Sequence, residues 1–235
     1  MRWRGARSGA PFSRGAGVPV AVQAVPFLAA LLVAGLVLGY ALGPWGGFPV
    51  VVLALFVLFF FRDPERIPPE GEALVLSPAD GRVTEVRRGP EGTRVSVFLS
   101  LLDCHINRAP VAGVVREARY TPGRFHPAWQ GRASSENERN HLIIGTDGGD
   151  YGVTQVAGVL ARRIVCTKRA GDTVLRGERI GLIRFGSRTD LHLPPGVEPL
   201  VRVGDRVKGG LTLMARPDVS QAAAAGVMAG SGIRA

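Results

Sequence analysis

Cysteine is scarce in this chain of 235 residues, which contains only Cys104 and Cys166. The two lie far apart, and neither belongs to a CxxC or Cys/His pattern, so they form neither a disulfide framework nor a zinc site. The four histidines show neither the HxxxH nor the HExxH spacing of metalloenzymes. No metal is therefore expected, and reduced thiols in a cytoplasmic domain are the simplest assumption.

Lysine is as rare as cysteine, with Lys168 and Lys208 alone, although the formal net charge is +10. Arginine carries this charge and suits phosphate-bearing partners such as nucleic acid or an anionic membrane. A genome that favours arginine codons would explain the excess equally well. Aromatic residues are few, and they are not interleaved with the arginines as in a base-stacking surface. We therefore expect no nucleic-acid partner.

Long apolar runs occupy the N-terminal quarter of the chain. Residues 21–42 form a run of 22, more than the roughly 20 needed to cross a bilayer as a helix. A Gly-Pro-Trp-Gly-Gly break follows, and residues 48–61 form a second run that would make only about 21 Å of helix. We predict a disordered basic segment at 1–20 and a hydrophobic helical hairpin at 21–61. A buried hairpin of a soluble protein is the alternative.

The hairpin is expected to attach the protein to the cell membrane, although the sequence leaves open whether it spans the bilayer or only dips into it. Arginines flank the hairpin on both sides: Arg2, Arg4, Arg7 and Arg14 come before it, and Arg62 and Arg66 follow it. If both runs cross, the positive-inside rule places everything after residue 61 in the cytoplasm.

Beyond residue 61 the sequence predicts β structure, because short stretches rich in Val, Ile and Leu recur between Gly, Pro and Asp turns. Two segments, Arg169–Gly177 and Arg202–Gly210, share a GD-x-V-x-x-G pattern typical of barrel-sandwich folds related to lipoyl carriers. The predicted fold is mainly β (α+β). A compact β-sandwich or barrel-sandwich-like catalytic domain covers 62–219, and a flexible tail covers 220–235. Eight strands are predicted: Ala73–Leu76, Arg82–Val86, Thr93–Leu99, Gly113–Arg119, His141–Gly145, Gly152–Ala157, Ile164–Thr167 and Ile180–Phe185.

Polar residues gather in three segments of this domain. The first is Ser77–Arg82, where Asp80 precedes a glycine, as in an Asx turn. The second is Asp103–Pro110, which brings His105, Asn107 and Arg108 together just after an apolar stretch. The third, Ser135–Asn140, has a solvated loop as its simplest interpretation. Taken singly, the first two are explained as well by turn formation and by a structural histidine.

A fourth segment contains the pair Gly186-Ser187 after a predicted strand, where the simplest interpretation is a turn. The pair also allows chemistry, because the carbonyl of a residue without Cβ can be approached closely. The Ser187 hydroxyl lies within reach of that carbonyl, which permits an N-to-O acyl shift to an ester. β-Elimination would then split the chain and leave a dehydroalanine, and hydrolysis with loss of ammonia would give a pyruvoyl group.

Together these segments resemble phosphatidylserine decarboxylase in its shorter archaeal and bacterial form. The resemblance covers roughly residues 25–215, and the matching segments occur in family order. They are Phe60-Phe61-Arg62-Asp63-Pro64, Ser77-Pro78-Ala79-Asp80-Gly81, Asp103-x-His105-x-Asn107-Arg108-Ala109-Pro110, Glu136-Asn137-Glu138-Arg139-Asn140, Gly171-Asp172 and Phe185-Gly186-Ser187-Arg188.

The resemblance implies a proenzyme that cuts itself between Gly186 and Ser187. The products would be a β chain, 1–186, and an α chain, 187–235, held together as a heterodimer. Ser187 would become a covalent pyruvoyl cofactor that forms a Schiff base with membrane phosphatidylserine. Loss of CO₂ and hydrolysis would release phosphatidylethanolamine.

The resemblance also implies roles for single residues, with Ser187, His105 and Asp80 as the catalytic set and Asp80 orienting the histidine. Longer bacterial members carry D-x-H-x-x-H, but here Arg108 replaces the second histidine, and arginine stays protonated. The base for self-cleavage is therefore left open between His105 and another group such as His192. Substrate binding is expected from Arg108, Arg188 and Asn107.

Two other functions remain open from the sequence. One is a non-enzymatic membrane-tethered carrier or adaptor, which the GD-x-V-x-x-G pattern suggests but which lacks a lysine placed for lipoylation. The other is a pyruvoyl decarboxylase of a soluble amino acid, for which a membrane anchor has no purpose. A higher homo-oligomer and the acyl-chain preference are not decided.

Overall fold

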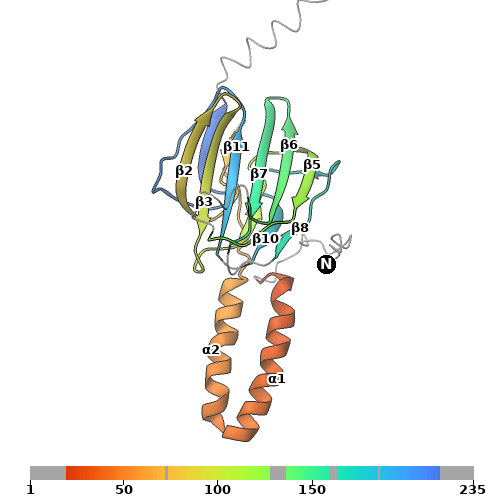
Figure 1. Ribbon diagram of the computed structural model, residues 1–235, viewed down its shortest axis with the longest axis vertical. Helices are drawn as coiled ribbons and strands as arrows, with labels where there is room; N and C mark the ends of the chain where they lie inside the picture. The colour runs from red at the N-terminus through yellow and green to blue at the C-terminus, as the bar shows by residue number, and fades with distance from the viewer. Residues whose placement is uncertain (1–19, 72–73, 128–135, 159–162, 185, 218–235) are drawn as a thin grey trace, which may run out of the picture.

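The computed structural model describes residues 20–71, 74–127, 136–158, 163–184 and 186–217. A helical hairpin projects from one end of a β domain (Figure 1). The predicted disordered segment at 1–20, apart from Val20, and the predicted tail at 220–235 lie outside the described residues. Within the described ranges the fold is mainly β with an N-terminal apolar hairpin, as the sequence predicts.

The hairpin consists of a short 3-10 turn, η1 (Val22–Ala24), and two helices, α1 (Val25–Leu42) and α2 (Pro44–Phe60). The chain reverses at Gly43, whose φ of 67° lies in the left-handed region that glycine adopts readily. Pro44 then begins α2, where its fixed φ suits the first helical position. The segment Val22–Leu42 is long and apolar enough to cross a membrane, whereas α2 is shorter than that, at 17 residues.

Within the described ranges, fourteen strands form three antiparallel sheets. The largest has eight strands in the order β13-β2-β3-β11-β7-β6-β5-β9, and two three-stranded sheets have the orders β1-β14-β12 and β4-β10-β8. The strands are β1 (Val75–Leu76), β2 (Gly81–Gly89), β3 (Gly92–Leu99), β4 (Ile106–Arg108), β5 (Gly113–Thr121), β6 (Arg139–Thr146), β7 (Gly149–Val156), β8 (Ile164–Cys166), β9 (Thr173–Val174), β10 (Arg179–Ile183), β11 (Ser187–Leu193), β12 (Val197–Pro199), β13 (Arg206–Val207) and β14 (Leu213–Pro217).

The GD-x-V-x-x-G pattern marks an internal structural repeat. In both Arg169–Gly177 and Arg202–Gly210 the Asp carboxylate accepts a hydrogen bond from the backbone N–H three residues earlier, at 2.8 Å. In both, the first glycine donates at 2.8 Å to a valine carbonyl, that of Val115 in β5 or Val83 in β2. Each of these strands has a register shift directly after that valine. The two halves of the large sheet are therefore built alike, with β11 and β7 at its centre.

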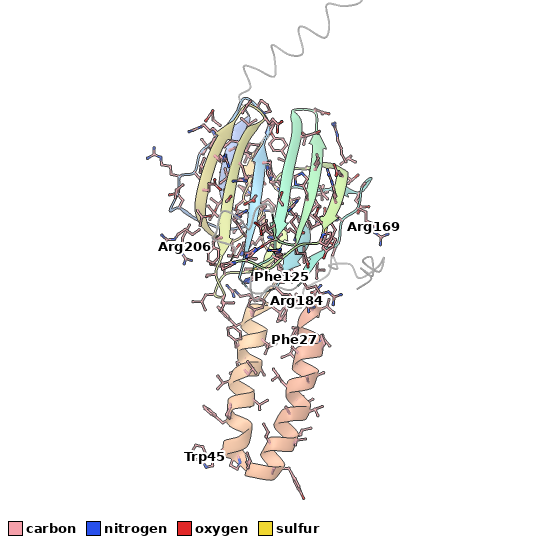
Figure 2. All side chains as sticks on the ribbon, in the orientation of Figure 1. Phe27, Trp45, Phe125, Arg169, Arg184 and Arg206 are labelled. Carbon is pink, nitrogen blue, oxygen red and sulfur yellow. The ribbon has the colours of Figure 1, made fainter. Side chains whose placement is uncertain are left out.

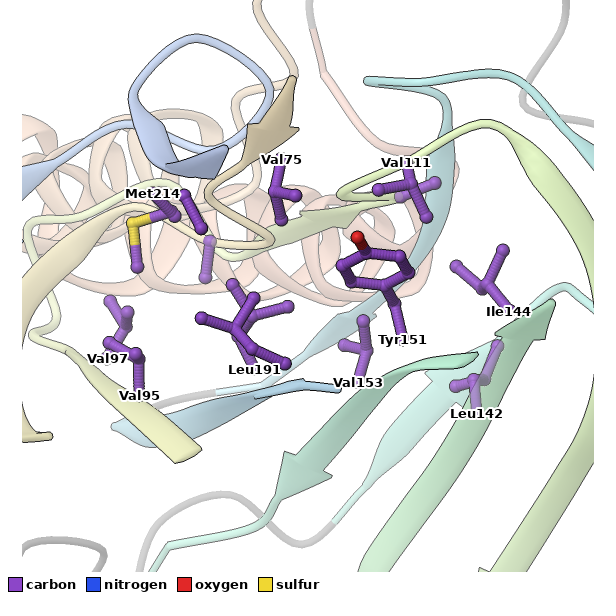
Figure 3. Close-up of a cluster of buried hydrophobic side chains, with 14 of the residues drawn as sticks. Val75, Val95, Val97, Val111, Leu142, Ile144, Tyr151, Val153, Leu191 and Met214 are labelled. Carbon is purple, nitrogen blue, oxygen red and sulfur yellow. The ribbon is translucent and has the colours of Figure 1, made fainter. Parts of the chain in front are cut away.

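The core lies inside the β domain and is made by alternate residues of the strands, since neighbouring side chains on a strand point to opposite faces. Figure 3 shows part of this cluster, with contributions from β3, β6, β7, β11 and the small sheet of β1 and β14. Its labelled members are Val75, Val95, Val97, Val111, Leu142, Ile144, Tyr151, Val153, Leu191 and Met214.

The hairpin is joined to the domain by a second apolar cluster. Phe60 and Phe61, at the end of α2, pack with Cys104, Ile106 and Leu182 of the domain. The next residue, Arg62, donates hydrogen bonds to the carbonyl of Phe59 at 2.9 Å and to that of Leu102 at 2.6 Å. These contacts place the start of β4 and the end of β10 directly above the helices.

Candidate active site

Ser187 is the first residue of β11 and pairs with Leu99 at the end of β3. Its side chain is fully buried. Gly186 precedes it with a φ of 55°, in the left-handed region that costs other residues about 1 kcal/mol or more. A Cβ at Gly186 would meet no atom within 4 Å, so the backbone conformation, not the space available, favours glycine here.

The strand that begins at Ser187 corrects the sequence-based interpretation, which treated the Gly-Ser pair as a turn. β11 is central and pairs with both β3 and β7. The sequence of β11 does not show the full alternation of apolar and polar residues expected of a strand, because its polar residues Thr189 and Asp190 are also buried. The available clue was the sequence Thr-Asp-Leu-His-Leu, in which leucines alternate with polar residues.

His105 is buried, with 2% exposure, and its ring lies 4.2 Å from that of Phe60, centroid to centroid. Its Nδ1 is 2.9 Å from the carbonyl oxygen of Asp103, so Nδ1 carries the proton and donates, which leaves Nε2 as an acceptor. Among the described residues, neither His105 Nε2 nor Ser187 Oγ has a hydrogen-bond partner. A buried serine hydroxyl and a buried imidazole acceptor without partners are candidates for a nucleophile and its base.

Two strands bring these groups to the same end of the domain. A tight turn follows β3, in which the Asp103 carboxylate accepts hydrogen bonds from the backbone and the hydroxyl of Ser100 at 2.8 and 2.6 Å. His105 follows this turn, and its carbonyl accepts from the N–H of Ile183 at 3.3 Å. The chain of β10 then runs on from Ile183 towards Gly186. His105 and Ser187 therefore both lie close to the ends of β3 and β10.

A chain of buried amides ties β4, which directly follows His105, to the strand of Ser187. Asn107 donates to the Thr189 hydroxyl at 3.0 Å and accepts from Gln155 at 2.8 Å. Asn140 in turn donates to Gln155 at 3.1 Å. Asn107, in β4, is two residues from His105, and Thr189 lies two residues from Ser187 on the same face of β11. The structure therefore places Asn107 in a positioning network that the sequence did not reveal.

Asp80 is held by a different partner from the one expected. Its carboxylate accepts two hydrogen bonds from Arg66, at 2.5 and 2.8 Å, and one from the N–H of Gly209 at 2.8 Å. No hydrogen bond to His105 is found among the described residues; the carbonyl of Asp103 orients the imidazole instead. Asp80 nevertheless lies close enough for its charge to act on the pKa of His105.

The two arginines expected to bind substrate are engaged inside the domain. Arg108 is 3% exposed and donates to the carbonyls of Gly177 and Pro64, at 3.0 and 2.8 Å, beside the carboxylate of Asp63. Arg188 forms a buried ion pair with Asp190 at 2.8 Å. Such buried pairs are costly to break, because a lone charge would be left behind. These contacts favour a structural role for both.

Residues 53–215, more than half of the chain, match the family model described as phosphatidylserine decarboxylase. The chain belongs to this family. The phosphatidylserine decarboxylase proenzyme of Beijerinckia indica is 45% identical over 207 residues, which cover 84% of this chain and 89% of that protein. That of Gluconacetobacter diazotrophicus is 48% identical over 205 residues, covering 81% and 91%. That of Cereibacter sphaeroides is 49% identical over 176 residues, covering 70% and 76%.

Membership of the decarboxylase family confirms the expected family and a decarboxylase enzyme, and it disfavours the carrier or adaptor alternative. The roles expected of Ser187, His105, Asp80, Asn107, Arg108 and Arg188 remain predictions. Sequence reasoning did not find Asp63, Arg66, Thr189 or Gln155 as partners of these residues. Asp63 and Arg66 stand in the Arg-Asp-Pro-Glu-Arg segment, where alternating charges were the available clue.

His192, the other base considered for this decarboxylase, lies elsewhere on β11. Five residues of strand separate it from Ser187, or about 16 Å. Its Nε2 is 2.9 Å from the Thr154 hydroxyl, which also lies 2.7 Å from Nδ1 of His141. His192 is thus part of a separate polar cluster across β6, β7 and β11, and this position does not favour it as the base for cleavage at Ser187.

The stability of this decarboxylase is expected to fall with acidification because of His105. Burial lowers the pKa of His105 from 6.5 to about 4, so the unfolded chain binds this proton more readily than the folded chain. The stabilisation, about 3 kcal/mol, is complete above pH 6.5 and is lost as the pH falls towards 4. Urea unfolding of the uncleaved Ser187→Ala chain in detergent, measured from pH 8 to 4, checks this. Adding His105→Asn should make the pH dependence shallower, and an unchanged dependence would contradict the assignment.

Proposed function

We propose that this chain decarboxylates phosphatidylserine after cutting itself at Gly186-Ser187 and converting Ser187 into a pyruvoyl cofactor. The observation that carries the proposal is the pair of unsatisfied buried atoms, Ser187 Oγ and His105 Nε2, beside a glycine at φ 55°. Neither atom is engaged by another described residue, so the imidazole is available to take the proton of the hydroxyl. No second function is favoured by a specific contact in the described residues.

Self-cleavage starts when the Ser187 hydroxyl gives its proton to His105 Nε2 and its oxygen attacks the carbonyl carbon of Gly186. The C–N bond between the two residues breaks as the nitrogen takes up the proton, which leaves an ester. Removal of the Ser187 α-proton then breaks the Cβ–Oγ bond and releases Gly186 as a carboxylate. The dehydroalanine left at position 187 takes up water and loses ammonia.

The resulting pyruvoyl group supplies an electrophilic carbonyl that accepts the electrons left when CO₂ departs. The residues around it hold it in place: the amide chain through Asn107 fixes β11 against β4. His105 is neutral at physiological pH, because its pKa is about 4, and so keeps a proton acceptor at this position. Burial of the residue at 187 also limits the access of water.

The cut chains are expected to stay together as a heterodimer. The α chain begins with β11, which is hydrogen-bonded on both edges to strands of the β chain. Further along, β13 pairs with β2, and β14 pairs with β1. Each sheet that contains a strand from residues 187–235 thus also contains strands from residues 1–186, so cleavage of one peptide bond leaves these contacts in place.

The membrane is proposed to lie at the end of the domain that carries the site, with the domain on its cytoplasmic side. Both helices leave the domain at this end (Figure 1). Leu101 and Leu102, in the turn after β3, are 38% and 68% exposed, and the carbonyl of Leu102 accepts from Arg62 at the foot of α2. A lipid substrate could then reach residue 187 without leaving the bilayer completely.

A substrate comparison tests the proposal. The purified protein should release CO₂ from vesicles that contain phosphatidylserine, and a carbonyl reagent such as phenylhydrazine should abolish this activity. Free serine at a matched concentration should release none. CO₂ from free serine would instead support a decarboxylase of a soluble amino acid, and activity that resists the carbonyl reagent would overturn the pyruvoyl assignment.

A further inference from the structure

We propose that Arg184 and Arg163 form the binding site for the phosphodiester of the lipid substrate. The inference rests on the proposed function and deepens it, since it assigns the group that holds the head group beside residue 187. Arg184 is three residues before Ser187, a span of at most about 10 Å. It lies at the junction between the domain and the helices (Figure 2), where its guanidinium faces the ring of Phe27.

Arg184 is partly buried and carries no carboxylate partner among the described residues. Its guanidinium carbon lies 5.4 Å from the ring centroid of Phe27, in the first turn of α1, and its Nε is buried without a hydrogen-bond partner. Its backbone N–H donates to the carbonyl of Arg163 at 3.3 Å. A guanidinium without a counter-charge therefore stands between the reacting serine and the entry of α1 into the domain.

Arg163 adds a second positive charge to the same place. Burial and the neighbouring positive charge of Arg163 lower the pKa of Arg184. The surroundings of Arg184 therefore destabilise its charged form. An anion bound between the two would relieve both effects, and arginine matches phosphate oxygens with paired N–H donors. Five other arginines of the domain already have carboxylate partners, namely Arg66, Arg108, Arg179, Arg188 and Arg206. Arg62, at the foot of α2, donates instead to the carbonyls of Phe59 and Leu102.

The phosphodiester is favoured over the carboxylate of the same head group for two reasons. It lies between the serine moiety and the acyl chains, as Arg184 lies between Ser187 and the helix that is proposed to enter the membrane. The carboxylate is the group that must lose its charge and leave as CO₂. A fixed ion pair with it would stabilise the substrate more than the transition state and slow the reaction.

Kinetics on mixed micelles of detergent and phosphatidylserine test the site. Arg184→Gln should raise KM for the lipid about ten- to hundredfold, the range for loss of a charged hydrogen bond, with complete self-cleavage and little change in kcat. Arg163→Gln should raise KM in the same direction. Arg87→Gln removes the same charge from an exposed position near the opposite end of β2 and should leave both constants unchanged.

A phosphotriester analogue, in which methylation removes the phosphate charge, identifies the group that is bound. The wild-type protein should prefer the diester, and Arg184→Gln should lose most of this preference. An unchanged KM in both variants, or an unchanged preference for the diester, would overturn the inference. An increase in KM matched by an equal loss of binding to anionic vesicles, measured by sedimentation, would also overturn it, because Arg184 would then be a general membrane contact. Inactive wild-type protein would instead refute the proposed function.

Discussion

The Ser187→Ala variant is expected to remain a single chain of full mass and to release no CO₂ from phosphatidylserine. Without the hydroxyl no ester can form, so the chain is not cut and no pyruvoyl group arises. Wild-type protein should instead give two fragments on denaturing electrophoresis, the smaller starting at residue 187. Intact mass should show this fragment lighter by one ammonia than simple hydrolysis would give, with a blocked N-terminus.

Ser96→Ala is the matched control. Ser96 is also a buried serine of the large sheet, on β3, and its Oγ has no hydrogen-bond partner among the described residues. Removing this hydroxyl should leave self-cleavage and decarboxylation intact. Two fragments from Ser187→Ala, or full activity from an uncut wild-type chain, would refute the pyruvoyl mechanism at this position.

The His105→Ala variant should cut itself about 10² to 10⁴ times more slowly than the wild type, the range for loss of a general base. The reason is that, among the described residues, Nε2 of His105 is a buried proton acceptor without a partner at the serine's end of the domain. Added imidazole should restore part of the rate, because it can occupy the space left by the side chain. Electrophoresis of freshly translated protein over time measures the rate.

His192→Ala provides the comparison for this base. Both histidines have a pKa lowered to about 4 by burial, but His192 is bound to Thr154 away from the cleavage site. Its loss should leave the cleavage rate within about threefold of the wild type, as for a substitution that removes no transition-state contact. Normal cleavage by His105→Ala, or no rescue by imidazole when the variant is folded, would assign the proton transfer to another group.

Local patterns in the sequence were sufficient for much of the fold. The apolar runs predict both helices, and Gly43 and Pro44 mark the turn between them. The eight predicted strands all have counterparts, because alternating apolar residues and Gly or Pro turns act over a few residues. The GD-x-V-x-x-G pattern occurs in two segments, and the hydrogen bonds within the two segments are nearly identical.

The strand β11 could not be predicted in the same way. Its buried Thr189 and Asp190 are satisfied by Asn107 and Arg188, and the first of these contacts spans 82 residues of chain. In the sequence, a buried polar residue whose hydrogen-bond partner is distant along the chain cannot be distinguished from an exposed polar residue. The position of Ser187 at the start of a central strand therefore became visible only when β3 and β7 were seen on either side of it.

The sequence by itself determined the family, the apolar hairpin and the Gly186-Ser187 pair that we propose is cleaved, because each depends on residue type and order. The tertiary structure decided which polar groups are left without partners. It placed Arg108 and Arg188 in buried ion pairs and paired Asp80 with Arg66. Among the described residues it left His105 Nε2, Ser187 Oγ and Arg184 Nε without a hydrogen-bond partner. These assignments depend on hydrogen bonds and ion pairs mostly between segments far apart in the chain, which residue order alone does not specify.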